Sequence, residues 1–427
     1  MAKHHVVIVG GGFGGLYAAR SLRRAPVRVT VVDRRNYHLF QPLLYQVATG
    51  GLSPADISSP LRSVLRAQRD THVVQAEAVD LDAAGRRLIL KDGELGYDTL
   101  IVAAGGHHHY FGHDEWARRA PGLKTIEDAT AMRGRILGAF ERAERSTDPD
   151  RTRELMTFVI VGAGPTGVEL AGAIGEMARH TLARDFRRIH PPEARILLVE
   201  GAGRVLPSYP ERLSAAARRS LARLGVEVLT ATTVSEVDAR GVVLSRDGHG
   251  VREAAATVLW AAGVQASPLA RVLRDKAGAR LDRADRVIVE PDCSIAGHPE
   301  ILVIGDMARL EQPRGQPLPG VAPVAIQQGR YVSRLVVDRM HGRSPPPFHY
   351  RDKGSLAVIG RAAAVAELGR FQFSGYLAWL LWLFVHIMLL VGFENRVLVF
   401  VQWAFSYFTR NRGARLITDS GDLDDPV

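Results

Sequence analysis

The chain has 427 residues, of which 46% are hydrophobic and 23% charged, so it can form two or three domains with full-sized cores. Its formal net charge of +10 suits an anionic cofactor, anionic lipid or nucleic acid, but the arginines are scattered and no nucleic-acid motif is present, which argues against nucleic acid. The single cysteine, Cys293, excludes disulfides within the chain, a two-cysteine redox relay and a Cys-rich metal site.

The N-terminus leads directly into a predicted strand, His4 to Val9, with no apolar signal segment, so we expect the chain to start in the cytoplasm. The strand runs into a first G-x-G-x-x-G on Gly10, Gly12 and Gly15, followed by a predicted helix over 16–24. Such a turn lets a pyrophosphate approach the backbone and places it at the positive end of a helix.

A second strand, Val27 to Val32, ends in Asp33. A carboxylate at this position can bind a ribose 2′-hydroxyl, although an Asp after a strand is also common in turns. The apolar, amide-rich stretch 36–53 contains Pro42 and is expected to pass near a cofactor ring. An antiparallel meander is predicted over 73–90, broken at Gly85.

The run LIVAAGG over 100–106 predicts a buried strand that closes on Ala104 and Gly105. A helix over 127–145 and a polar linker over 146–154 follow, and the linker is expected to be the first domain boundary.

The second glycine turn lies between a predicted strand, Thr157 to Val161, and a helix that begins near Pro165. Its glycines are Gly162, Gly164 and Gly167, and a later strand ends in Glu200. The intervening residues 177–192 predict an extended helix and a loop. An acidic residue at position 200 favours NADH over NADPH, although Arg204 leaves NADPH open.

The two halves of the chain repeat one plan. A helix over 212–224, a strand over 226–231 and a meander precede VLWAAG, which ends at Gly263 and matches the AAG after the first meander. A further strand, ILVIGD, delivers Gly305 and Asp306, suited to a ribityl or ribose hydroxyl or to a helix cap. Two dinucleotides with different roles imply hydride transfer from NADH to a tightly held FAD.

At this point the sequence resembles the two-dinucleotide-binding flavoproteins and, more narrowly, the type II (non-proton-pumping) NADH:quinone oxidoreductases. The resemblance covers nearly the whole chain. The residues that carry it are GGGFGG (10–15), HLFQPLLYQVATG (38–50), APGLKTIEDA (120–129), GAGPTGVELAG (162–172), VIGD (303–306), APVAIQQG (322–329) and KGSLAVIG (353–360).

The resemblance implies an α/β fold with two Rossmann-like, glutathione-reductase-like domains and a C-terminal membrane-associating helical segment. The expected parts are an FAD domain over 1–120 and 276–350, an NADH domain over 121–275, and a membrane-anchoring region over 351–427. FAD would be held by Gly10, Gly12, Gly15, Asp33 and Asp306, and NADH by Gly162, Gly164, Gly167 and Glu200. The cofactor sites would also include Phe13, Gly14, Ala104, Gly105, Pro165, Thr166, Gly263, Gly305, Ala325 and Gln327.

Four catalytic residues are also implied by the resemblance. Glu169, expected on the first helical turn, would lie near the nicotinamide–flavin contact; alternatively it only complements the helix dipole. Gln327 and Gln328 would face the quinone side of the flavin, and Lys353 would stabilise negative charge. Residues His107 to His109 depart from the family pattern; we interpret them as a loop and expect no metal site.

The C-terminal region is apolar. Residues 376–393 carry no formal charge, Glu394 to Arg396 interrupt them, and 397–408 resume the run. Arg410, Arg412 and Arg415 precede an acidic tail that we expect to be disordered. The apolar segments suit two helices in the membrane interface, a spanning helix or a dimer interface.

The sequence therefore predicts an FAD-dependent NADH:quinone oxidoreductase of a respiratory chain, monotopic on the cytoplasmic face of the inner membrane. A membrane quinone and lipid are the expected partners, and a homodimer is a family expectation. Three alternatives stay open: a soluble NAD(P)H-dependent reductase of an iron–sulfur protein, a sulfide:quinone oxidoreductase, and a non-enzymatic NADH-sensing binding protein. The single cysteine argues against the second.

Overall fold

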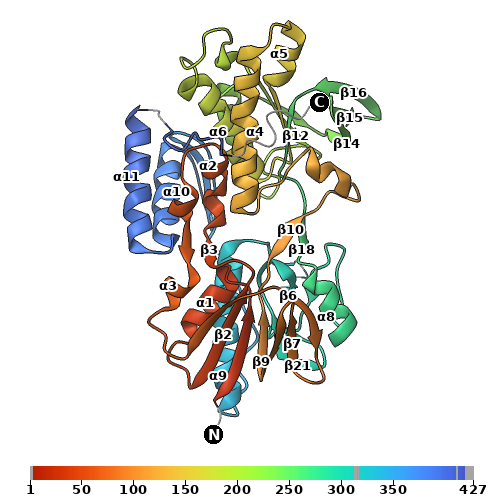
Figure 1. The fold of residues 1–427 in the computed structure, drawn as a ribbon, viewed down its shortest axis with the longest axis vertical. Coiled ribbons are helices and arrows are strands. Elements are labelled where there is room, and N and C mark those ends of the chain that lie inside the picture. Colours follow the sequence, from red (N-terminus) through yellow and green to blue (C-terminus); the bar gives the residue numbers. More distant parts are fainter. Residues whose placement is uncertain (1–2, 312–314, 316, 410–411, 419–427) are drawn as a thin grey trace. The chain divides into compact units, whose positions relative to one another are not determined.

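The computed structural model describes residues 3–311, 315, 317–409 and 412–418 (Figure 1). Arg410 and the acidic tail after residue 418 lie outside the described residues. The chain divides into two compact units, each assembled from three segments. Unit 1 comprises Met1–Leu39, Ser58–His107 and Val264–Asp352, and unit 2 comprises Phe40–Ile57, His108–Gly263 and Lys353–Val427. The domain plan predicted from the sequence included residues 40–57 in the FAD domain, within 1–120.

Unit 1 is built on a six-stranded sheet with the strand order β20-β21-β9-β1-β2-β5. Only the pair β20 and β21 is antiparallel. Val7 and Ile8 of the central strand are fully buried, as expected for a parallel strand covered on both faces. The strands are β1 (His4–Val9), β2 (Val27–Asp33), β5 (Thr71–Gln75), β9 (Thr99–Val102), β20 (Ser294–Ile295) and β21 (His298–Val303).

Two helices pack against each other in unit 1, α1 (Phe13–Ser21) and α9 (Ala322–Met340). They approach closely because Gly329 has no side chain: a Cβ there would lie 2.3 Å from the carbonyl oxygen of Gly14. The shorter elements are β3 (Tyr37–Leu39), β4 (Ser58–Pro60), α3 (Leu61–Leu65), the meander β6 (Ala78–Asp82), β7 (Arg87–Leu90) and β8 (Gly93–Gly96), β10 (Gly106–His108), β18 (Val264–Ala266), α8 (Leu269–Ala277), β19 (Val287–Ile288) and β22 (Ala308–Arg309).

Unit 2 contains a four-stranded parallel sheet with the order β13-β12-β11-β17. Val159, Leu197 and Trp260 belong to its core, where Tyr110 stacks on Trp260 with ring centroids 5.1 Å apart. Each such fully buried large side chain contributes about 1.5–3 kcal/mol to folding. The strands are β11 (Thr157–Val161), β12 (Arg195–Glu200), β13 (Val226–Thr230) and β17 (Thr257–Trp260), and the main helices are α4 (Ile126–Arg145), α6 (Pro165–Glu176) and α7 (Glu211–Arg223).

The internal repeat predicted from the sequence is confirmed by the two sheets. Strand β1 lies between β2 and β9 just as β11 lies between β12 and β17. Each central strand is followed by a glycine turn and a helix, α1 or α6. The other elements of unit 2 are α2 (Leu44–Ala48), α5 (Pro149–Leu155), β14 (Thr233–Asp238), β15 (Gly241–Arg246), β16 (His249–Ala254), β23 (Ser355–Gly360), β24 (Ala363–Leu368), β25 (Phe371–Gly375), α10 (Tyr376–Leu389) and α11 (Phe393–Thr409).

Three local predictions were wrong. Residues 71–75 join the parallel sheet beside β2 and do not open the meander, which starts at β6. Most of the predicted linker 146–154 lies in α5, which spans Pro149–Leu155. This helix forms because Asp148 accepts a hydrogen bond from the backbone N–H of Asp150 (2.9 Å) and Pro149 suits the first helical position. His107 and His108 lie in strand β10 instead of a loop.

The C-terminal part of unit 2 is a three-stranded antiparallel sheet, β23-β24-β25, followed by α10 and α11. The two helices lie side by side (Figure 1), with ring contacts between Trp379 and Tyr407 (5.3 Å) and between Trp382 and Trp403 (5.2 Å). Across the part of the chain that the structure describes, none of the helices has the combined length and apolar character that a membrane crossing requires.

The packing of α6 on β23 predicts that Gly172 tolerates no side chain. A Cβ there would lie 1.7 Å from the carbonyl oxygen of Ile359. We expect Gly172→Ala to lower the free energy of unfolding by about 1–3 kcal/mol or more, measured by denaturant titration.

Gly134→Ala in α4 is the matched control. Apart from the adjacent residues and the nearby backbone of its own helix, no atom lies within 4 Å of its Cβ position, so alanine should leave stability unchanged or raise it by about 0.5–1 kcal/mol. Equal destabilisation by both substitutions would contradict the close approach at Gly172.

Candidate active site

The first glycine turn follows β1 in unit 1. Gly10 has a φ of +100° and donates its N–H to the carbonyl oxygen of Val32 (2.8 Å). A Cβ on Gly15 would lie 1.8 Å from the carbonyl oxygen of Gly10, so the helix begins directly on the turn. Gly12 is the N-cap of α1 and provides no side-chain cap, which leaves the first-turn amides suited to a phosphate. Helix α1 starts at Phe13, earlier than predicted, because the turn and the helix start coincide.

The second glycine turn, in unit 2, repeats this geometry. Gly162 has a φ of +98° and donates its N–H to the carbonyl oxygen of Val199 (2.8 Å). A Cβ on Gly167 would lie 1.8 Å from the carbonyl oxygen of Gly162. Gly164 is the N-cap of α6, again without a side-chain cap, and Pro165 and the exposed Thr166 open the helix. Each unit therefore presents one glycine turn whose geometry suits a phosphate.

The two acidic strand ends hold these turns. Asp33 accepts the backbone N–H groups of Gly11 (2.6 Å) and Arg35 (2.8 Å). Glu200 likewise accepts those of Ala163 (2.7 Å) and Ala202 (2.8 Å). The sequence predicted a ribose contact for both carboxylates and left a turn role open for Asp33. Each carboxylate oxygen has a second acceptor site, so binding the turn and binding a ribose hydroxyl are compatible.

Other predicted cofactor residues lie after the strands. Ala104 and Gly105 follow β9, and Gly263 follows β17; the two glycines have φ values of +68° and +71°. No atom lies within 4 Å of a Cβ placed on Gly105, which leaves space beside this strand end. Asp306 lies in a 3₁₀ turn, Gly305–Met307, directly after Ile304 and β21.

The amides of α9 bind the backbone. Gln328 is buried and its Oε1 accepts the N–H of Gly305 (2.8 Å), which fixes the turn that carries Asp306. Gln327 forms two hydrogen bonds with the backbone of Arg351: Nε2 donates to the carbonyl oxygen (2.9 Å) and Oε1 accepts the N–H (3.0 Å). Ala325 is buried one turn earlier, and Lys353, in unit 2, is exposed.

His38 provides a test of whether these residues fit a bound dinucleotide. Its side chain is 1% exposed, packs edge-on against Phe13 (5.2 Å) and donates Nδ1–H to the carbonyl oxygen of Gly11 (2.9 Å). Burial lowers its pKa to about 4, so Nε2 is an acceptor, and it has no hydrogen-bond partner among the described residues. A buried, unpaired acceptor beside a phosphate-binding turn fits a cofactor that supplies hydroxyl donors.

Glu169 lies in unit 2 on α6. The helix begins at Pro165, so Glu169 is on its second turn, and the predicted first-turn position was wrong. Burial raises the pKa of its carboxyl to about 8, although a hydrogen bond from the backbone of Val358 acts in the opposite direction. A carboxyl with this pKa is protonated at neutral pH, which favours a role in proton transfer over a helix-dipole role.

Two residues beside Glu169 escaped the analysis of the sequence. Tyr45, on α2, is 7% exposed; burial raises the pKa of its phenol, and the Glu169 carboxyl adds to the rise. Burial and Glu169 likewise raise the pKa of Tyr209. Tyr45 lies in the amide-rich stretch 38–50, but no local signal places its phenol beside a residue more than a hundred positions away.

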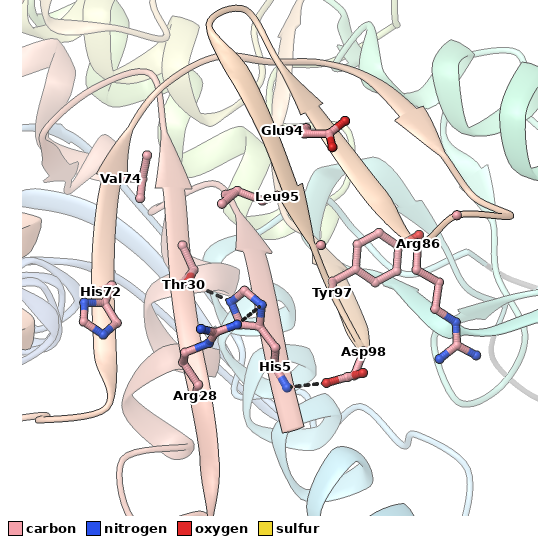
Figure 2. Close-up of a pocket in the computed structure, with 12 residues that line it drawn as sticks. His5, Arg28, Thr30, His72, Val74, Arg86, Glu94, Leu95, Tyr97 and Asp98 are labelled. Atoms are coloured by element: carbon pink, nitrogen blue, oxygen red, sulfur yellow. Dashed lines mark hydrogen bonds between the residues drawn. The ribbon is translucent and has the colours of Figure 1, made fainter. Parts of the chain in front are cut away.

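A cavity of about 730 Å³ lies elsewhere in unit 1, at the amino ends of β1, β2 and β5 (Figure 2). Figure 2 shows His5 between its two partners: Arg28 donates to Nδ1 (3.0 Å), so Nε2–H donates to the hydroxyl of Thr30 (2.8 Å). Nucleotides bind at the carboxyl ends of parallel strands, where the glycine turns are. This cavity is therefore separate from the predicted cofactor site.

Two family models match the chain. The pyridine nucleotide-disulphide oxidoreductase model matches residues 4–329, and the NDH2 C-terminal domain model matches residues 353–411. The chain is 46% identical to the type II NADH:quinone oxidoreductase Ndh of Mycobacterium tuberculosis, over 98% of this chain and 91% of that protein. It is 28% identical to the type II NADH:quinone oxidoreductase of Staphylococcus aureus, over 84% of this chain and 88% of that protein.

Solved structures show the same fold at low sequence identity. NDH2 from Plasmodium falciparum in complex with NADH aligns with a TM-score of 0.88 at 20% identity, covering 96% of this chain and 99% of that one. The sulfide:quinone oxidoreductase of Aquifex aeolicus aligns with a TM-score of 0.72 at 16% identity, covering 98% and 93%.

The contacts of Glu200 predict that Glu200→Gln weakens NADH binding. An amide retains one acceptor oxygen but cannot accept the N–H groups of both Ala163 and Ala202, so the turn loosens where the nucleotide binds. We expect the Kd for NADH to rise about tenfold or more, which corresponds to about 1.4 kcal/mol. Titration of NADH with the purified protein measures this.

FAD content is the internal control, because the carboxylate of the other turn, Asp33, is unchanged. An unaltered NADH affinity would contradict the assignment of Glu200.

Proposed function

The chain belongs to the pyridine nucleotide-disulphide oxidoreductase family and, within it, to the type II NADH:quinone oxidoreductases, and from this premise we propose how its residues perform the reaction. The overall change is NADH + H⁺ + quinone → NAD⁺ + hydroquinone. When bound, FAD supplies the two-electron relay that accepts hydride from NADH and reduces the quinone. The reaction proceeds without proton pumping.

The duplicated, carboxylate-held glycine turn carries this proposal. In unit 1 the turn of Gly10, Gly12 and Gly15 with Asp33, Asp306 and the unpaired acceptor of His38 would hold FAD. In unit 2 the turn of Gly162, Gly164 and Gly167 with Glu200 would hold the NADH that enters and leaves. Both turns present backbone amides at a helix start, which suits a pyrophosphate in each case.

Glu169 is the proposed proton-handling residue. The carboxyl is protonated at neutral pH, and it is close enough to Tyr45 and Tyr209 to act electrostatically on both phenols. Formation of hydroquinone consumes protons, and a carboxyl with a pKa of about 8 can hold one near the reacting rings. Gln327, Gln328 and Lys353 are proposed at the quinone side, where the two amides would act by fixing Arg351 and Gly305.

An apolar face on the C-terminal elements supports attachment to a membrane. The exposed side chains alternate on strand β25 and recur at helical spacing on the two helices. They are Phe371 and Phe373 on β25; Tyr376, Leu377, Leu380, Phe384 and Met388 on α10; and Val397, Leu398, Phe400, Val401, Phe405 and Phe408 on α11. Two short helices with such a face suit the interface of one leaflet. We propose peripheral placement on the cytoplasmic face of the inner membrane, with a homodimer as the family expectation.

Anaerobic stopped-flow absorbance tests the proposed function. NADH should bleach the flavin absorption of the purified protein, and a short-chain quinone should restore it. Absence of quinone-dependent reoxidation would exclude the second half-reaction, and a colourless protein that cannot be reconstituted with FAD would exclude both.

The raised pKa of Glu169 predicts a pH-dependent rate. The carboxyl is protonated below pH 8 and ionises above it, so if the protonated form acts, kcat/KM should fall as the pH rises through about 8. Glu169→Gln should remove this inflection and lower kcat about 100-fold.

Glu141→Gln is the control for the pH profile, since Glu141 is exposed on α4. Its profile should match the wild type. An inflection that persists in Glu169→Gln would assign the titration to another group.

The apolar face predicts a site for membrane binding. Phe384 and Phe405 are 62% and 61% exposed, and replacing both with Asp should abolish flotation with anionic liposomes, because a carboxylate is costly to place in the interface. Val251→Asp on β16 is the matched control, since Val251 is 63% exposed on a different sheet. Flotation of the double variant at the wild-type level would place the anchor elsewhere.

A further inference from the structure

The segment after α11 packs against other parts of unit 2, mainly through Arg412. We refer to residues 412–418 as the C-terminal clamp. The Arg412 side chain is 11% exposed and forms an ion pair with Glu176 of α6 (3.3 Å). Its Nη1 donates to both the carbonyl oxygen (3.1 Å) and the hydroxyl (2.7 Å) of Thr49. A guanidinium this far from water is retained only where such partners compensate its desolvation.

The rest of the clamp reinforces this attachment. The N–H of Ala414 donates to the carbonyl oxygen of Gly50 (3.1 Å), and Arg133 of α4 donates to the carbonyl oxygen of Ala414 (3.2 Å). Arg415 forms an ion pair with Asp185. The clamp thus holds the residues that directly follow α2, Thr49 and Gly50, against the body of unit 2.

Helix α2 is held from a second side by α11. Trp403 donates its indole N–H to Oε1 of Gln46 (2.8 Å), and Nε2 of Gln46 donates to the hydroxyl of Tyr45 (2.9 Å). The hydroxyl of Thr49, which Arg412 contacts, itself donates to the carbonyl oxygen of Tyr45 (2.9 Å). Both C-terminal contacts therefore converge on Tyr45.

Tyr45 in turn lies beside the proposed proton-handling residue. Glu169 and Glu176 are seven positions apart on α6, so they lie two turns apart on one face, and α2 packs on this helix. The Tyr45 phenol is close enough to Glu169, Arg412 and Glu176 for all three to act on it electrostatically. We refer to Glu169, Tyr45, Glu176 and Arg412 as the row; Tyr45 is buried and the other three are partly buried.

We propose that Arg412 is a positioning residue for the reaction: it clamps α2 against α6, keeps Tyr45 beside Glu169, and thereby makes the segment that follows the membrane-docking helices part of the active site. This inference rests on the proposed function of Glu169. The charged and titratable groups at this row come from α2 (Tyr45), α6 (Glu169 and Glu176), the loop before α7 (Tyr209), β24 (Glu367) and the clamp (Arg412 and Arg415).

The test substitution is Arg412→Gln in the full-length, FAD-loaded protein. Loosening α2 admits water to Glu169, so we expect kcat with NADH and a short-chain quinone to fall about tenfold or more while the KM values for both stay near wild type. The inflection in the pH profile of kcat/KM should move to lower pH, towards the ordinary range of a carboxyl. FAD content and liposome flotation should be retained.

Three further variants separate positioning from a general loss of structure. Arg412→Lys keeps the charge and should restore part of the rate. The pair Glu176→Gln with Arg412→Gln removes both buried charges and should be less impaired than Arg412→Gln alone. Arg153→Gln on α5 is the control, and it should behave as wild type because its side chain and that of its partner Asp150 are 72% and 91% exposed.

Arg412→Gln with a wild-type rate and pH profile would overturn the proposal. So would loss of FAD or of folding in all three variants at Arg412, because the residue would then be structural only. Failure of the proposed function is distinguishable, since the unmodified protein would then show no quinone-dependent turnover.

Discussion

The hydrogen bonds between each acidic strand end and the neighbouring glycine turn are the contacts on which the arrangement depends. Asp33 and Glu200 each bind the second residue of a turn, Gly11 or Ala163, and so fix a loop that has no side chains of its own to hold it. The parallel register of β1 with β2 and of β11 with β12 brings carboxylate and turn to the same edge. In each unit one acidic residue therefore fixes the glycine turn and keeps acceptor sites that could bind a ribose hydroxyl.

Two glycines without side chains also allow close packing that involves the C-terminal part of the chain. Gly329 brings α9 against α1, and Gly172 brings α6 against β23. Because β23 lies so near α6, the backbone of Val358 reaches the Glu169 carboxyl, and Glu176 accepts a hydrogen bond from the N–H of Arg361. Residues beyond position 353 are thus part of the surroundings of the central helix.

Much of the fold could be predicted from the sequence because its signals are local. An apolar run marks the strand at 157–161. Each glycine turn directly follows such a run, and each carboxylate, at 33 and 200, ends one. Strand β5 was missed because its apolar pattern suits a meander as well as a parallel edge, and only pairing with β2 decides. The row from Glu169 to Arg412 joins three separate segments, α2, α6 and the clamp, so no local pattern could reveal it. The same holds for the backbone contacts of Gln327 and Gln328. In the sequence their side-chain amides indicated contacts with a quinone, and only the structure shows their backbone partners.

The division of each unit into three segments has a consequence for biosynthesis. The sheet of unit 1 requires β21, and the surroundings of α6 require β23 and the clamp, all encoded in the last third of the chain. Neither unit can be completed while the ribosome is still translating that third. The nascent chain must therefore keep one unfinished sheet and the uncovered helix α6 from aggregating until late in synthesis, and we expect it to rely on chaperones during that interval.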